Sequence, residues 1–341
     1  RTEQNGMLKE EEKFEFIINH DSDIPKYQQL VNGINNAIAE NILQKGDLLP
    51  SVNSICKTNQ LSRDTVFKAY TILKDQKTID SVPNKGYYVS GETRKVLLVL
   101  DTFKAYKEVL YHSVVNNLPD NVIIDVQFHH YNIDVFKTII NNGIGKYYKY
   151  VVMNFDHNDI APTLSAISSD KLLLIDWNIQ GDKTNNYVFQ DFGKAFYNAL
   201  IEAVDLFKKY KKIEFVYPDF TNHPYETVEF FKKFCTDFNF QYEIITDPKK
   251  FNIEKGIAYI SVSDRILGHF LEQCKEKDFE PGKDVGFLSY NETPMKKFIY
   301  KGISVVSTDF KEIGTKAAAF ITHEEDIQCY VPTKLIIRES L

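Results

Sequence analysis

Hydrophobic positions follow two different periods along the chain. In the N-terminal quarter they recur every three or four residues, as at Leu30, Ile34 and Ile38, which is typical of an amphipathic helix. The same spacing continues at Val52, Ile55, Val66, Ala69 and Leu73. Turn signals at 45–47 and 59–60 separate these runs. The pattern therefore predicts consecutive short helices in this part of the chain.

The pattern then changes to strands. Residues 82–89 form two short apolar stretches around Asn84-Lys85-Gly86, which predicts a hairpin. Polar residues 90–94 predict a linker. Beyond them, short apolar runs alternate with helical ones: KVLLVLD, VIIDVQF, YVVMNF, KLLLID, IEFVYP, FQYEII, GIAYISV, DVGFLS and GISVVST. Nearly continuous apolar strands with helical crossovers predict an open parallel sheet, and their number indicates two lobes of an α/β domain.

Composition narrows the class of protein only a little. The 341 residues are 43% apolar and 26% charged, which fits a packed chain of two or three domains. No run approaches the roughly 20 apolar residues that a membrane-spanning helix needs. The first residues contain no apolar segment of the export type, and the four cysteines form no CxxC pair, so a cytoplasmic protein is expected. The net charge of −6 means that any nucleic-acid contact must be local.

The N-terminal helices carry the first candidate site. Ser51 and Ser62 each precede a helical run, where a hydroxyl caps the free N–H groups of the first turn. Two capped helices this close together predict a helix-turn-helix, whose second helix enters the DNA major groove by its first residues. Arg63 begins that helix, and its guanidinium matches the O6 and N7 atoms of guanine. Between 52 and 89, six basic residues outweigh three acidic ones, which favours contact with phosphate.

The hairpin completes this candidate interface, because glycine permits a tight tip and a neighbouring lysine reaches the DNA backbone. The residues predicted to contact DNA are Ser51, Asn53, Ser62, Arg63, Asp64, Thr65, Lys68, Lys85 and Gly86. The alternative for the Ser-Arg-Asp-Thr start alone is a capped surface helix. The register of both caps with the hairpin favours DNA binding.

Four blocks between residues 24 and 89 resemble the winged helix-turn-helix of GntR-type transcription regulators: IPKYQQLVNGI, ILQKGDLLPSV, LSRDTVFKAYTIL and NKGYYV. The resemblance implies that Ser51, Arg63, Thr65 and Gly86 contact DNA. The chain departs from the family at Asn53, where the family usually carries arginine, and at Lys68, which replaces another common arginine.

The second candidate site lies where strands of the α/β domain end, because parallel sheets bind ligands outside the carboxyl ends of their strands. Acids, amides and rings gather there, a mixture that binds polyols: polar atoms take the hydroxyls, and rings cover C–H patches. Trp177, the only tryptophan, is the expected stacking platform. The predicted ligand contacts are Asp101, Phe103, Tyr106, Asn154, Asp156, Asp176, Trp177, His223, Ser263, Asp264, Tyr290 and Asn291.

Some of these side chains have structural alternatives. Asp156, Asp176, Asp191 and Asp264 each also suit the start of a following helix, and capping is the favoured role of Asp191 and Asp264. His129, His130 and His157 have no acid or cysteine partner at metal-ligand spacing, so neither a metal nor another cofactor is expected.

The domain from residue 95 onward resembles the effector domain of the lactose-repressor family, which shares its fold with periplasmic sugar-binding proteins. The resemblance is clearest in SVSDRILGHF, DVGFLSYNETP, ISVVSTDFKEIGTKAAAFI and PTKLIIRESL. It implies that Ser263 and Asn291 touch a sugar. Asn291 stands where the family usually has aspartate, and the family's sugar-binding arginine is missing, with His223 or Glu226 as candidate substitutes.

Together the two resemblances imply a sugar-responsive transcription regulator, most simply a repressor of a carbohydrate-utilisation operon. Its expected partners are operator DNA, a small sugar and a second copy of the chain in a homodimer, with no membrane. The expected domains are a 1–23 extension, a 24–90 DNA-binding domain, a 91–95 linker and a 96–341 effector domain. The alternatives are an enzyme, for which no nucleophile–base pair is visible, and a solute-binding protein, which would need an export signal.

Overall fold

A computed structural model describes residues 16–341 except for 84, 92, 180–184 and 324–325. The chain divides into two compact units. One reaches to Leu98 and also contains Leu118–Val126 and Asn142–Tyr150. The other contains Val99–Asn117, Gln127–Asn141 and Val151–Leu341.

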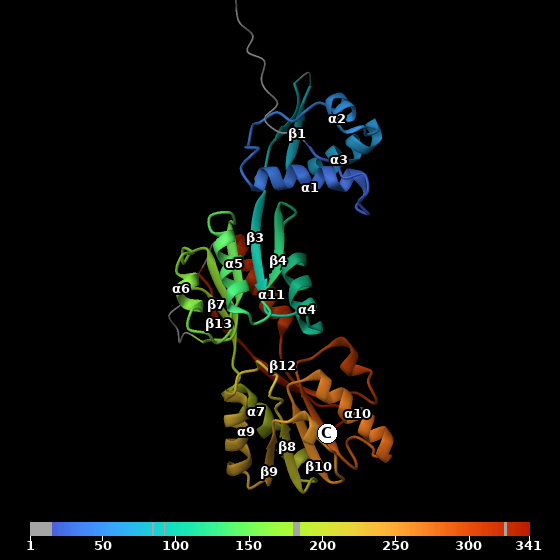
Figure 1. The fold of residues 1–341 in the computed structure, drawn as a ribbon, viewed down its shortest axis with the longest axis vertical. Coiled ribbons are helices and arrows are strands. Elements are labelled where there is room, and N and C mark those ends of the chain that lie inside the picture. Colours follow the sequence, from blue (N-terminus) through green and yellow to red (C-terminus); the bar gives the residue numbers. More distant parts are fainter. Residues whose placement is uncertain (1–15, 84, 92, 180–184, 324–325) are drawn as a thin grey trace, which may run out of the picture. The chain divides into compact units, whose positions relative to one another are not determined.

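The N-terminal elements form a winged helix-turn-helix (Figure 1). They are α1 (Lys26–Ala39), α2 (Val52–Asn59), α3 (Arg63–Asp75), β1 (Ile79–Val82) and β2 (Gly86–Val89). The apolar positions predicted from the helical period lie together in one core, with Leu30, Ile34, Val66 and Leu73 fully buried. The two strands pair antiparallel, Ile79 with Val89, which confirms the predicted hairpin. Asn84 lies outside the described residues.

The remaining elements form two six-stranded sheets, so the predicted two-lobed α/β architecture is confirmed (Figure 1). The first sheet has the order β13-β7-β6-β5-β3-β4. Its lobe contains β3 (Arg94–Leu100), α4 (Ala105–Asn116), β4 (Val122–Phe128), α5 (Ile133–Gly143), β5 (Lys149–Met153), α6 (Ile160–Leu164), β6 (Leu172–Asp176), β7 (Tyr187–Gln190), α11 (Phe310–His323) and β13 (Gln328–Val331). Since β3 begins at Arg94, the last two residues of the expected linker belong to this strand.

The second sheet has the order β14-β12-β11-β10-β8-β9. Its lobe contains α7 (Lys194–Glu202), α8 (Val204–Phe207), β8 (Lys212–Val216), α9 (Glu226–Asp237), β9 (Tyr242–Ile245), η1 (Pro248–Lys250), β10 (Ile257–Ser261), α10 (Asp264–Lys277), β11 (Gly286–Tyr290), η2 (Pro294–Lys297), β12 (Ser304–Thr308) and β14 (Thr333–Ile336). All its strand pairs are parallel except β12 with β14, which the sequence analysis did not anticipate.

Alternation along β10 gives this sheet a core on each face. Ala258 and Ile260 pack with residues of α7 and α9, whereas Ile257 and Tyr259 pack with residues of α10. Figure 1 accordingly shows α7 and α9 on one side of the sheet and α10 on the other. Burial on both faces explains why the strands read as continuous apolar runs.

The chain passes between the lobes three times: after β7 into α7, after β12 into α11, and from β13 into β14. Helix α11 belongs to the first lobe, where it packs against α4, and the Ser113 hydroxyl donates to the Lys311 carbonyl at 2.6 Å. The three crossing segments that connect the lobes follow the carboxyl ends of β7, β12 and β13.

Candidate functional site

The first candidate site is the start of α3 with the neighbouring start of α2. Ser51 caps α2 by accepting a hydrogen bond from the Ser54 N–H at 3.1 Å. Ser62 caps α3 by accepting from the Thr65 N–H at 3.2 Å, and the two hydroxyls lie 2.8 Å apart. These bonds satisfy N–H groups that would otherwise have no partner, so they fix where α3 begins.

The caps leave charged and polar side chains exposed at these helix starts. Arg63 is the first residue of α3 and is exposed, with its guanidinium carbon 5.7 Å from the centre of the Phe67 ring. Asn53 and Asp64 are exposed as well, and Thr65 is half-buried. The ammonium of Lys68 lies 3.8 Å from the centre of the Tyr27 ring on α1. An exposed arginine at a capped helix start has the geometry of direct base readout.

Lys85 and Gly86 lie at the tip of the hairpin and are exposed. Gly86 has φ +97°, a left-handed conformation that favours glycine, and a Cβ there would meet no atom within 4 Å. Glycine is therefore favoured at this position because of the backbone conformation, and not because neighbouring atoms leave no room for a side chain. The tip presents an ammonium on a tight turn, as a wing that touches a phosphate requires.

The second candidate site is a cleft within the larger unit, lined by both lobes. Its outer part is a cavity of about 450 Å³. This outer part is lined by Thr102, Lys104, Tyr106, His130, Tyr131, Phe220, Thr221, Asn222, Val262, Ser263, Asp264, Arg265, Tyr290 and Asn291. A smaller inner part adds Asp101, Asn154, Asp176, Trp177, Gln190, Phe192, His223 and Pro224. The cleft therefore brings together ten of the twelve predicted ligand residues.

The two exceptions are Phe103 and Asp156. Phe103 is 83% exposed and contacts Phe128, with ring centres 5.6 Å apart, and it does not line the cleft. Asp156 is exposed and also lies outside the lining. Both follow strands of the first lobe, but their side chains do not line the cavity, although Thr102 and Lys104 on either side of Phe103 do. The rule that ligands bind after parallel strands locates a loop and does not say which of its side chains point inward.

A buried ion pair between Asp101 and Lys107 lies beneath the cleft. Asp101, at the end of β3, forms an ion pair with Lys107, accepts a short hydrogen bond from the Tyr131 hydroxyl, and accepts from the Thr102 N–H at 2.5 Å. Lys107 is only 3% exposed. Burial lowers the pKa of Lys107 to about 8, an effect that the charge of Asp176 opposes. Asp101 is therefore committed to positioning Tyr131 and α4.

Asp176 and His223 face the inner cleft from opposite lobes. Burial raises the pKa of Asp176, against the charges of Lys107 and Lys104 and a short hydrogen bond from the Gln190 amide. Burial also lowers the pKa of His223 to about 3, with a further contribution from Lys104. The His223 Nε2 atom lies 2.8 Å from the Thr227 hydroxyl. This histidine is uncharged at neutral pH and contributes a polar, neutral surface.

Several buried polar atoms at the cleft have no hydrogen-bond partner among the described residues. They are both side-chain atoms of Asn154, which is 3% exposed, the hydroxyl of Tyr290, which is 2% exposed, and Oδ1 of Asn291. Leaving such groups unpaired costs about 1–3 kcal/mol each, so their presence together points to a ligand that supplies both donors and acceptors. Trp177 lines the same inner part.

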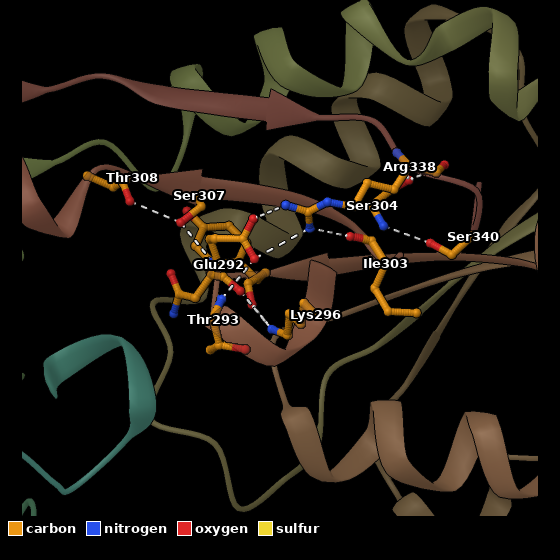
Figure 2. A network of polar contacts seen from close by, with 11 residues as sticks. Glu292, Thr293, Lys296, Ile303, Ser304, Ser307, Thr308, Arg338 and Ser340 are labelled. Atoms are coloured by element: carbon orange, nitrogen blue, oxygen red, sulfur yellow. Dashed lines mark hydrogen bonds and ion pairs between the residues drawn. The ribbon is translucent and has the colours of Figure 1, made fainter. Parts of the chain in front are cut away.

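A polar network around Lys296, Glu292 and Arg338 (Figure 2) fixes the loop that carries Tyr290 and Asn291. The buried Lys296 ammonium donates to the carbonyls of Tyr290 at 3.1 Å and Asn291 at 2.7 Å, and it pairs with Asp264 at 2.7 Å. Beside it, Glu292 forms an ion pair with Arg338, whose guanidinium also donates to the Ile303 carbonyl at 2.7 Å. Asn291 is held at φ +63°.

The structure assigns Asp191 and Asp264 different roles from the expected capping. Asp264 is the first residue of α10, whose N-cap Ser263 makes no side-chain cap bond, and its carboxylate pairs with Lys296 instead. Asp191 accepts from the Gly193 N–H at 2.9 Å, one turn before α7 begins. Asp264 lines the cleft, and the expectation that it caps the helix is wrong.

Sequence reasoning missed His130, Tyr131, Lys104, Thr221 and Asn222. The first two follow β4, and the rule applied to the other strands would have found them there. Lys104 sits in the loop after β3 beside predicted residues, and Thr221 and Asn222 follow β8. Among the described residues, His, Cys, Asp and Glu side chains do not gather in groups of three or more that would bind a metal ion. No helix in the described part of the chain is long and apolar enough to cross a membrane.

Comparison with known proteins finds relatives of the N-terminal part and solved structures that share the fold of the larger part. The family model of bacterial regulatory proteins, gntR family, matches residues 26–89. The chain is 30% identical over 95 residues to the HTH-type transcriptional repressor YtrA of Bacillus subtilis, covering 28% of this chain and 72% of that protein. It is 39% identical over 71 residues to the uncharacterized HTH-type transcriptional regulator YdcR of Escherichia coli, covering 21% of this chain but only 15% of YdcR.

Solved structures match the larger part of the chain. The trehalose repressor from Escherichia coli is 13% identical, with a TM-score of 0.61 over 72% of this chain and 100% of that one. A LacI family transcriptional regulator from Enterococcus faecium with bound ribose is 13% identical, with a TM-score of 0.59 over 72% of this chain and 98% of that one. The dimeric Lac repressor is 12% identical, with a TM-score of 0.60 over 72% of this chain and 98% of that one. At such identities the likeness establishes the fold.

Proposed function

Because the chain belongs to the GntR family of bacterial regulatory proteins, we propose that it represses a carbohydrate-utilisation operon under the control of a small sugar or sugar derivative. The observation that carries this proposal is the presence, in one chain, of an exposed arginine at a capped helix start and a two-lobed cleft with unpaired buried polar groups. The first feature suits operator DNA, and the second suits a polyol.

The DNA-binding part, residues 24–90, reads the operator through the start of α3. Arg63 contacts guanine in the major groove, and Thr65 and Lys68 contact a thymine methyl group or phosphate. Ser51, Ser62, Asn53 and Asp64 border this surface, while Lys85 and Gly86 place the wing on the backbone. A homodimer sets two such helices about one DNA turn apart on a palindromic operator. The fold shared with the dimeric Lac repressor supports this assembly.

The effector part, residues 96–341 after a short linker, binds the sugar between its lobes. Asn154, Tyr290 and Asn291 provide the unpaired polar atoms, Asp176 accepts from hydroxyls, and Trp177 covers a C–H face. Ser263, Asp264, Tyr106 and His223 complete the contact surface, and Asp101 positions it. The trehalose repressor and the ribose-bound regulator share this fold, which supports a sugar as the ligand. The cleft acts as a binding site and not as an enzyme active site, and the protein works in the cytoplasm, where bacterial operators lie.

Closure of the lobes on the ligand changes the geometry of the dimer, and operator affinity changes with it. Typical couplings of about 1–3 kcal/mol correspond to a change in affinity of about 5–150-fold.

Selection from random duplex DNA, followed by fluorescence anisotropy on the winning sequence, tests the DNA-binding half. The expected result is a palindrome bound at least about 1,000-fold more tightly than random DNA at the same salt concentration. Equal affinity for selected and random duplexes would exclude an operator-specific regulator.

A further inference from the structure

The cleft contains more positive charge than its own carboxylates balance. We propose that the effector is an anionic polyol, whose phosphate or carboxylate group is held in the outer cleft between Lys104 of the first lobe and Arg265 of the second. This inference rests on the proposed function and names the ligand class of the same site.

The two cations face the same cavity from different lobes. Lys104 directly precedes α4, and Arg265 lies in the first turn of α10; both line the outer cavity of about 450 Å³. Neither forms an ion pair with a carboxylate within 4 Å among the described residues, whereas the buried Lys107 and Lys296 at the cleft both do. The Arg265 guanidinium carbon lies 4.5 Å from the centre of the Phe220 ring, which holds it at the cavity wall.

Each carboxylate at the cleft already has a partner. Asp264 pairs with buried Lys296 at 2.7 Å, Asp101 pairs with Lys107, and Asp176 accepts from Gln190. The charges of Asp264 and Asp176 act on Lys104 only at longer range, and burial lowers its pKa. Lys104 and Arg265 are exposed to solvent, and an anionic ligand in the cavity would give both the counter-charge that no described side chain supplies within 4 Å. The unpaired charge of the cleft is therefore positive.

Uncharged hydrogen-bond donors also line the outer cavity, next to Lys104 and Arg265. Helix α10 is 14 residues long, no side chain caps its first turn, and Ser263, Asp264 and Arg265 at its start line the cavity, so the positive end of its dipole lies there. Independently, Tyr290 is 2% exposed and lines the cavity, and its hydroxyl has no hydrogen-bond partner in the described chain. Oxygen atoms of a phosphate or carboxylate accept from all of these groups at once.

The inner cleft selects the other end of the ligand. Asn154 offers an unpaired amide, Asp176 a carboxyl group and Trp177 a ring face, which together suit a hydroxylated carbon chain or sugar ring. A neutral sugar would occupy this part and leave Lys104 and Arg265 without a counter-charge. The combination favours a sugar phosphate or a sugar acid.

Thermal shift and calorimetry on the full-length protein test the proposal with two kinds of probe. The first is inorganic phosphate, compared with chloride at equal ionic strength. The second is a set of hexoses, each as the neutral sugar, the 6-phosphate and the uronic acid, which separates a phosphate source from a carboxylate source. Lys104→Gln, Arg265→Gln and the double variant are compared with Lys275→Gln, which removes an exposed charge at the far end of α10.

Inorganic phosphate should raise the melting temperature of the wild type and of Lys275→Gln, and not that of the double variant. One anionic form of a hexose should bind more tightly than its neutral parent, and each single variant should weaken it about tenfold or more. The proposal is overturned if phosphate shifts the wild type and the double variant equally, or if a neutral hexose binds as tightly as its anionic forms.

The two proposals fail in different ways. If a neutral sugar alters operator affinity, the proposal of an anionic effector is wrong, whereas the proposal of a sugar-responsive regulator still holds. Conversely, if the protein binds no DNA sequence specifically, the proposal of a transcription regulator is wrong, whereas the phosphate-binding experiment still tests the anionic site.

Discussion

At the scale of single residues, solvent exposure distinguishes the side chains proposed to contact DNA from those that form the core of the winged helix-turn-helix. Arg63 is exposed, whereas Val66, Ala69 and Tyr70 on the same helix are completely buried. The sequence predicted this division, because helical period and capping together fix which face of α3 points outward. The Lys68 contact with Tyr27 was not predictable, because it depends on how α1 packs across α3.

Replacing Arg63 by alanine should weaken operator binding by about 1–3 kcal/mol, or about 5–150-fold, because one bidentate contact to guanine is lost. Stability should change little, since the side chain is exposed. Anisotropy titrations measure the effect, with Lys57→Ala as a control for loss of one exposed charge on the neighbouring helix. Unchanged operator affinity in Arg63→Ala would remove α3 from the interface.

His129 gives the effector domain a dependence on pH. This buried side chain accepts from the Tyr131 N–H through Nδ1 at 3.0 Å, and its Nε2 lies 2.9 Å from the Met153 carbonyl, so the neutral form with a proton on Nε2 fits. Burial lowers the pKa of His129 to about 4. The unfolded chain takes up the proton first, so stability is lost as the pH falls from about 6.5 towards 4.

At pH 5 this single group should reduce the free energy of unfolding by about 2 kcal/mol relative to pH 7. His129→Gln should reduce that dependence by this amount and leave the separate contribution of buried His223 in place, whereas His269→Gln, an exposed histidine on α10, should not reduce it. Urea denaturation at both pH values provides the comparison. Parallel losses in wild type and His129→Gln would assign the effect to other groups.

At the scale of elements, strands with long apolar runs were predicted from the sequence, whereas the short strands β7 and β13 of the first lobe were missed. β3, β5 and β10 are buried along most of their length and stood out in the sequence. β7 and β13 have only four residues each, and β13 has exposed Gln328 and Tyr330. Such strands form because they pair with each other, and that long-range pairing leaves no local period.

Capping determines the stability of the recognition element. Ser62→Ala should destabilise the start of α3 by about 1 kcal/mol, because the Thr65 N–H loses its acceptor. Amide hydrogen exchange within α3 of the full chain should become faster, while α1 keeps its rates. Thr58→Ala, an exposed position in α2, serves as the control. Equal protection of α3 in wild type and Ser62→Ala would show that the cap contributes nothing.

At the scale of the whole molecule, the cleft is joined to the crossings between lobes by a chain of hydrogen bonds. The Thr308 hydroxyl donates to the Gln190 amide oxygen at 2.9 Å and lies 2.8 Å from the Thr333 hydroxyl, and the Gln190 amide donates to Asp176. Each of the three crossing segments contributes one member. The sequence did not reveal this chain, since its members come from three distant segments.

Thr308→Val should leave the buried Gln190 oxygen without its donor, at a cost of about 1–3 kcal/mol in the free energy of unfolding. Since Asp176 then loses its fixed orientation, the affinity for the effector should fall as well. Thr236→Val, on the exposed face of α9, is the matched control. If Thr308→Val binds the effector as the wild type does and is equally stable, the chain does not position Asp176.

The central claim is that one chain couples a DNA-reading helix to a ligand cleft. Its most direct test measures two affinities with the same protein: that of the operator with and without saturating effector, and that of the effector with and without saturating operator. The account predicts that both change by one common factor of about 5–150. An effector that binds the cleft tightly and leaves operator affinity unaltered would contradict it.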